Sequence, residues 1–122
     1  MEKRVLVKKA TADLTGKEGY AVKLSADANY VEVCTAATDE AIGVLQRVNT
    51  LGLEVEVVMF GYCGLSVSGT VKSGQVATLT TASRFTGGKT DGAVFMAVFE
   101  QDGVSGDIVP AFVFPGARHE LG

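Results

Sequence analysis

Side chains that could carry out catalysis or bind a metal are few in this chain of 122 residues, and they do not gather. The single histidine, His119, stands three residues from the last residue, where a chain is usually too mobile to hold a general base in register. The two cysteines, Cys34 and Cys63, have no further cysteine or histidine at the spacing of a metal site. We therefore expect small, reduced thiols in apolar surroundings, although the sequence alone also allows a disulfide between them.

Two other patterns could bind a ligand. Glu54 and Glu56 share one face of a predicted strand, but a strand face in contact with solvent shows the same alternation of glutamate and valine. The stretch 87–90, Gly-Gly-Lys-Thr, resembles the end of a phosphate-binding loop. That loop needs an earlier glycine, where this chain has Ser83, and a following helix, where this chain has a strand pattern. A solvated strand face and a glycine-rich hairpin loop explain the two patterns better.

The sequence therefore predicts that the protein is not an enzyme. Serines and threonines are numerous, but without an interior histidine no base is evident that would activate one of them as a nucleophile. We expect no cofactor and no metal. The apolar runs fall short of the ~18 residues that cross a bilayer, and the first residues do not resemble a signal peptide, so we expect neither membrane insertion nor export.

Charge is distributed unevenly along the chain. Eleven lysines and arginines against 14 aspartates and glutamates give a net charge of −3, a sign that disfavours a nucleic-acid partner. Residues 1–17 hold five basic and two acidic residues, a local charge of +3, so the remaining residues carry −6. Such a basic segment is typical either of a solvated edge strand, whose lysines discourage aggregation, or of a docking segment for an acidic surface.

The elements that position these residues are expected to be β-strands. Apolar residues recur at every second position over most of the chain, and turn residues, among them many of the 15 glycines, separate the apolar segments. The expected strands are Val5–Lys9, Tyr20–Leu24, Val31–Cys34, Ala41–Leu45, Glu54–Phe60, Leu65–Ser68, Gln75–Thr80, Val94–Glu100 and Ile108–Phe114. Short strands at this spacing indicate one all-β domain, folded as a sandwich or a small antiparallel β-barrel.

The chain also resembles itself. Residues 41–60 align with residues 95–114 at an offset of 54, and Gly19–Leu24 align with Gly74–Leu79 at an offset of 55. A genuine repeat predicts a pseudo-twofold barrel in which both halves close one core. Any two β-hairpins share alternation, so the sequence leaves chance similarity open.

Three short motifs carry a resemblance to a known family: Gly-Tyr-Ala-Val-Lys-Leu at 19–24, Ala-Ile-Gly-Val-Leu at 41–45 and Gly-Gln-Val-Ala-Thr-Leu at 74–79. Together with the Val-x-Val strand that ends at Gly61, they resemble the small capsid cement, or decoration, proteins of tailed bacteriophages over residues 15–114. The resemblance implies a β-barrel or β-tulip domain that binds the outer face of an assembled capsid, most often as a trimer and in some relatives as a dimer. It implies no catalytic residues.

On this resemblance we expect a non-enzymatic virion protein, made in the host cytoplasm and located on the capsid outer surface. Its partners would be the major capsid protein and further copies of itself. An alternative is a soluble ligand-binding β-barrel module attached to a larger assembly. The alternative is weaker, because the chain has no tryptophan and only three tyrosines to build an aromatic binding platform.

The expected organisation is an extended N-terminal arm over residues 1–14, a barrel over 15–116 and a tail over 117–122. The basic arm is the expected capsid contact, through Lys3, Arg4, Val5, Lys8 and Lys9. The strand 94–99 is apolar on both faces, which indicates that either the core or a second subunit covers both. The residues expected in the core or at a subunit interface are Val94, Met96, Val98, Phe112 and Phe114.

Overall fold

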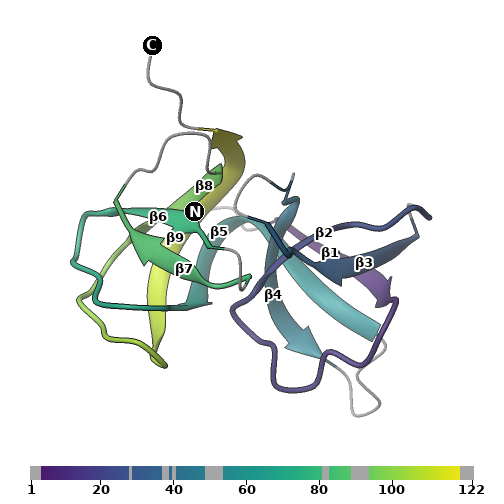
Figure 1. Cartoon of the computed structure of the whole chain (residues 1–122). Helices are drawn as coiled ribbons and strands as arrows, with labels where there is room; N and C mark the ends of the chain where they lie inside the picture. The colour runs from purple at the N-terminus through teal and green to yellow at the C-terminus, as the bar shows by residue number, and fades with distance from the viewer. Residues whose placement is uncertain are drawn as a thin grey trace.

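The structure is a computed structural model that describes residues 4–27, 29–36, 39, 41–48, 54–80, 83–88 and 94–118, with only the backbone for 94–96 and 115–118. These residues form strands and no helix (Figure 1). The strands are β1 (Arg4–Ala10), β2 (Ala21–Leu24), β3 (Tyr30–Val33), β4 (Gly43–Val48), β5 (Glu54–Ser66), β6 (Val76–Leu79), β7 (Phe85–Gly87), β8 (Val94–Phe99) and β9 (Ile108–Arg118). The described part of the chain accordingly holds no helix that could cross a membrane.

The first half of the chain closes into a five-stranded barrel, which confirms the expected fold class. The strand order is β1-β3-β2-β4-β5, and β1 pairs with β5 to complete the ring. The β1–β3 pair is parallel, and the other pairs are antiparallel. We call this unit lobe 1; it comprises β1 to β4 and residues 54–60 of β5.

The second half repeats this strand order. Residues 61–66 of β5 are followed in the sheet by β9, β8, β6 and β7, and we call this unit lobe 2. A parallel bridge between Val67 and Phe85 stands where lobe 1 has its β1–β3 pair. Figure 1 shows the two lobes side by side, with β6 to β9 on the left, β1 to β4 on the right and β5 running between them.

Hydrogen bonds outside the regular ladders confirm that the two lobes are copies of one unit. Five backbone bonds of lobe 1 recur in lobe 2 at the offsets seen in the sequence or within two residues of them. For example, Gly19 N–H donates to the Leu45 carbonyl as Gly74 N–H donates to the Phe99 carbonyl. The other pairs of bonds are Leu45 N–H to Tyr20 and Phe99 N–H to Gln75, Thr11 N–H to Val31 and Ser68 N–H to Phe85, Tyr20 N–H to Lys17 and Gln75 N–H to Lys72, and Cys34 N–H to Ala21 and Gly88 N–H to Val76. Matching bonds at matching positions make chance similarity an inadequate explanation of the repeat.

The two lobes have separate interiors, contrary to the expectation that both halves close one core. The lobe 1 interior contains Ala10, Leu14, Val22, Val31, Leu45, Val55 and Val57. The lobe 2 interior contains Leu65, Val67, Val71, Ala77, Leu79, Phe85, Ala97, Phe99, Val109, Ala111 and Val113. The reason is the shared strand, since each half of β5 serves as a wall of a different lobe.

Strand β5 changes direction at Gly61, whose φ is +114°. Residues before Gly61 pair with β1 and β4, and residues from Gly61 onward pair with β9. The sequence predicted two strands here, separated by the Gly61–Gly64 segment. The structure has one continuous strand, because a glycine with positive φ bends the chain without breaking its pairing.

The basic N-terminal segment is extended, as expected, but it belongs to the barrel. Strand β1 pairs with β5 from Arg4↔Phe60 to Lys9↔Glu54. It therefore forms one wall of lobe 1 and does not lie ahead of the fold as a free arm. Removing it would open the barrel.

Candidate functional site

No group of His, Cys, Asp and Glu side chains within the described residues could hold a metal ion. Cys34 and Cys63 are thiols and form no disulfide with each other, as predicted. Burial raises the pKa of the Cys34 thiol to about 12, so Cys34 is neutral near pH 7 and is a poor nucleophile. Cys63 lines a cavity of about 240 Å³ between the lobes, together with Leu45 and Ile108.

The single histidine, His119, lies outside the described residues.

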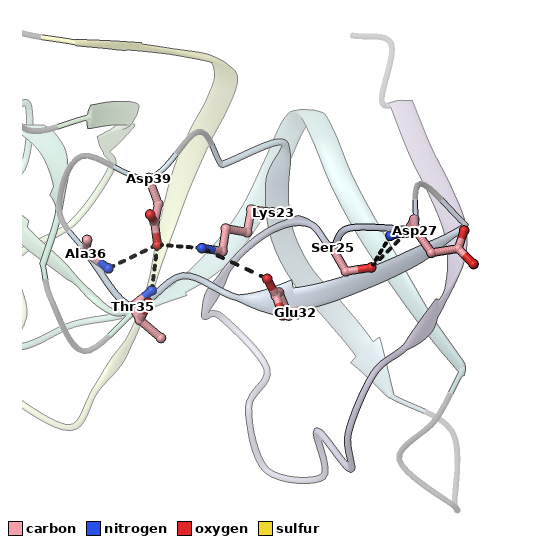
Figure 2. A network of polar contacts seen from close by, with 7 residues as sticks. All are labelled: Lys23, Ser25, Asp27, Glu32, Thr35, Ala36 and Asp39. Carbon is pink, nitrogen blue, oxygen red and sulfur yellow. Dashed lines mark hydrogen bonds and ion pairs between the residues drawn. The ribbon is translucent and has the colours of Figure 1, made fainter.

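The most connected polar group is centred on Asp39 (Figure 2). Its Oδ2 accepts hydrogen bonds from the N–H groups of Thr35 at 2.7 Å and Ala36 at 3.0 Å. The same oxygen lies 3.2 Å from Lys23 Nζ, which is 4.0 Å from Glu32. The Thr35 bond is the main reason that the pKa of Asp39 is lowered, and the Asp39 bond raises the pKa of Lys23. This network therefore holds the turn after β3.

The residues predicted to contact a capsid do not form one face. Lys3 lies outside the described residues, Arg4, Val5 and Lys9 are exposed, and Lys8 is half-buried. Lys8 lies opposite Val55, which belongs to the lobe 1 interior, so alternation turns Lys8 toward the interior side and Val5 and Lys9 toward the outer side. One of the three described basic residues of the expected contact, Lys8, is therefore directed toward the mouth of the barrel.

A groove opens at this mouth. Strands β1 and β3 pair only through Lys9↔Tyr30 and Ala10↔Val31, so earlier residues of β1 diverge from β3. The resulting cavity of about 500 Å³ is lined by Val7, Lys8, Lys9, Asp27, Asn29, Tyr30 and Glu54. The β2–β3 turn beside it is fixed by a bond from Asp27 N–H to Ser25 Oγ at 3.1 Å (Figure 2). This groove has two cationic and two anionic side chains, an open strand edge and one aromatic ring.

The residues predicted in the core or at a subunit interface lie outside the core where their side chains are described. Val98, Phe112 and Phe114 are partly exposed, whereas their strand neighbours Ala97, Phe99, Ala111 and Val113 are buried. The side chains of Val94 and Met96 are outside the described part. The interior positions are thus one residue away from those expected, because both faces of β8 and β9 are apolar in the sequence.

These three residues belong to a larger apolar surface, which we call the outer face of lobe 2. It consists of Phe60, the last lobe 1 residue of β5, and of the lobe 2 residues Tyr62, Val76, Val98, Ile108, Pro110, Phe112 and Phe114. Phe112 is at its centre. Its ring meets Phe60 edge-on, with centroids 5.4 Å apart, and Tyr62 edge-on, with centroids 5.6 Å apart. The sequence did not identify Tyr62 or Val76 as part of this surface. Val76 belongs to the predicted strand Gln75–Thr80, and Tyr62 lies in the segment Gly61–Gly64 that was predicted as a turn.

Comparison with protein-family models and with curated proteins gave no match to this chain. Three surfaces of the described structure are candidates for binding a partner: the groove at the mouth of lobe 1, the exposed basic residues of β1 and the outer face of lobe 2.

Proposed function

We propose that this protein is a non-enzymatic structural component of a phage head, which binds the outer surface of an assembled capsid and stabilises it. The observation that carries the proposal is the set of short motifs at 19–24, 41–45 and 74–79 that resemble those of capsid decoration proteins. The first and third motifs lead into β2 and β6, which are the same element of the two lobes. Two of the three motifs therefore occupy equivalent positions of a repeated structural unit.

The proposed capsid contact is the exposed side of β1 with the adjoining groove. Arg4 and Lys9 are exposed on β1, Lys8 lines the groove, and the local charge of the first 17 residues is +3. Such a surface fits an acidic region of a capsid subunit. A weak contact is sufficient for this role, because many copies bind one shell at the same time.

The proposed partners are the major capsid protein and further copies of this chain, arranged as a trimer or a dimer, on the outside of the virion after synthesis in the host cytoplasm. A β-barrel whose described residues form no candidate metal site is consistent with this role, since a protein that supports a shell needs surfaces and no reaction.

A soluble ligand-binding module attached to a larger assembly is the second candidate. The groove of about 500 Å³ favours it, because Lys8, Asp27 and Tyr30 together offer a cation, a carboxylate and an aromatic ring to a small polar molecule. The groove is built from one turn and the diverging end of β1, which also makes it suitable for an extended segment of a capsid subunit.

Co-sedimentation with expanded and unexpanded heads of the phage whose genome encodes the chain would test the main proposal. Binding to expanded heads is expected for the wild type and a large loss for the double variant Arg4→Glu, Lys9→Glu. The matched control is Lys72→Glu, which reverses a lysine of lobe 2 that is 65% exposed. Deleting β1 is unsuitable, because the barrel would open. Binding to neither type of head would refute the proposal.

A further inference from the structure

The two lobes differ in what covers their outer sheet faces. In lobe 1 the outward row formed by Ala21, Val44 and Val58 is fully buried. All three belong to the same apolar cluster as the lobe 2 interior. Ala21 N–H also donates a hydrogen bond to the carbonyl of Ser83, in lobe 2, at 2.8 Å. Lobe 2 therefore covers the outer face of lobe 1.

The repeat identifies the corresponding row in lobe 2. Ala21 lies opposite Val44, which lies opposite Val58, and in the same way Val76 lies opposite Val98, which lies opposite Phe112. These lobe 2 residues are partly exposed, and Tyr62, the next residue of the row, is 48% exposed. No described segment of the chain covers this row as lobe 2 covers its counterpart.

The uncovered row has the larger side chains. Val76 corresponds to Ala21, Phe112 to Val58, and Tyr62 to Val5. The outward residues of β9 from 108 to 114 are all apolar as well, namely Ile108, Pro110, Phe112 and Phe114. A solvent-facing copy of a buried surface would be expected to gain polar residues, and this one has gained aromatic and aliphatic area. Contiguous apolar surface of this kind marks a site of protein association.

We infer that a second copy of this chain covers the outer face of lobe 2, as lobe 2 covers the outer face of lobe 1 within the chain. Within the chain a β-lobe already packs on the equivalent face of lobe 1, which shows that lobes of this kind can bury such a row. The described outer face has no charged side chain that would select an acidic or basic partner. Aromatic, uncharged surfaces are typical of interfaces between identical subunits.

The inference assigns a surface to the self-association included in the proposed function, and its test needs no capsid. Light scattering coupled to size exclusion, over a range of concentrations, would give the mass of the purified protein. The wild type is expected to form a dimer or larger assembly. The double variant Phe60→Lys, Tyr62→Lys is expected to weaken association by at least about thirtyfold, because central aromatic residues dominate interface energies.

The matched controls are Val104→Lys, in the β8–β9 turn of the same lobe, and Leu24→Lys, at the end of β2 in lobe 1. These residues are 56% and 42% exposed and lie outside the outer face, so both controls should associate like the wild type. Circular dichroism and thermal unfolding would show that each variant is folded. A wild type that stays monomeric at every concentration would overturn the inference, as would a control that dissociates as strongly as the double variant. If the monomer binds phage heads through Tyr62, the capsid is the occupant and the second copy is not.

Discussion

Lobe 1 and lobe 2 share a backbone plan and differ in how their side chains use it. The interior positions Leu45 and Val31 of lobe 1 correspond to Phe99 and Phe85 of lobe 2, and Lys8, at the mouth of lobe 1, corresponds to the fully buried Leu65. Lobe 1 is thus a closed ring with a small core and an open mouth. Lobe 2 has a larger core, and where lobe 1 has the β1–β3 pair it has only the single bridge between Val67 and Phe85. Ring closure and core volume are alternative ways of stabilising the same unit.

The largest effect is expected from emptying the bigger core. Phe99 and Leu45 are equivalent and almost fully buried, so Phe99→Ala should lower the free energy of unfolding by about 3–5 kcal/mol and Leu45→Ala by about 2–5 kcal/mol. Chemical denaturation of the two variants would measure both. A smaller loss for Phe99→Ala than for Leu45→Ala would show that the closed ring, and not the larger core, dominates stability.

A pair of equivalent glycines separates backbone strain from packing. Gly19 and Gly74 have nearly the same φ, +87° and +85°, but a Cβ at Gly19 would lie 2.5 Å from Ser66 N, whereas a Cβ at Gly74 would meet nothing within 4 Å. Gly74→Ala should cost about 1–2 kcal/mol from strain alone. Gly19→Ala should cost about 1–3 kcal/mol more, since the lobes must move apart. Equal losses in denaturation would mean that the contact between the lobes can relax freely.

Acid should weaken lobe 1 first. Asp13 and Asp39 both lie in this lobe, and their pKa values are lowered by hydrogen bonds, from Thr15 for Asp13 and chiefly from Thr35 for Asp39. Carboxyls with a lowered pKa in the folded state stabilise it above their ordinary range, and this contribution is lost as the pH falls through the lowered pKa. The lobe 2 residue that corresponds to the charged Lys23 is the uncharged Thr78. The Thr78 hydroxyl donates a hydrogen bond to the Gly88 carbonyl.

Amide hydrogen exchange between pH 6 and pH 3 would resolve the two lobes. We expect faster opening of the segment after β3 as the pH falls. Asp39→Asn should cost about 1 kcal/mol at neutral pH and remove much of this acid response. Glu32→Gln is the control, because Glu32 is more exposed and lies 4.0 Å from Lys23. An unchanged pH profile in Asp39→Asn would show that the network does not control the opening.

The smallest effect is expected where the two lobes keep the same residue. Lys17 and Lys72 are equivalent lysines with different partners: Lys17 lies 5.1 Å from the centre of the Tyr20 ring, and Lys72 Nζ is 3.7 Å from Asp102. Exposed contacts of both kinds contribute about 0–1 kcal/mol. Lys17→Met and Lys72→Met should therefore unfold within about 1 kcal/mol of the wild type. Only the Lys72 effect should disappear on adding salt, and a salt-independent Lys72 effect would contradict an ion-pair origin.

Alternation and turn glycines were sufficient to predict the all-β fold and the repeat. They were not sufficient for β7, because Phe85–Gly87 is short and is followed by a second glycine. Nor did they distinguish the faces of β8 and β9, where inward and outward residues are equally apolar. The sequence shows that the N-terminal segment is basic, but periodicity does not say which strand it pairs with. Strand β1 pairs with a distant stretch of the chain, from Glu54 to Phe60.

The candidate surfaces were less predictable for a related reason. The groove depends on where β1 and β3 separate, and the outer face of lobe 2 depends on which copy of the repeat is covered. Both are properties of tertiary packing, and neither has a local pattern of residues that encodes it. Of the residues described on the outer face of lobe 2, the sequence singled out only Val98, Phe112 and Phe114. It left open whether they lie in the core or at a subunit interface.

The sharing of β5 has a consequence for how such a chain can change in size. The last strand of lobe 1 continues directly as the first strand of lobe 2, so the unit added by the repeat is four new strands and not five. A third unit would need only that the chain run on from β9 in the same manner. The arrangement is thus open-ended, as in a solenoid, because closure of one unit does not prevent the addition of the next.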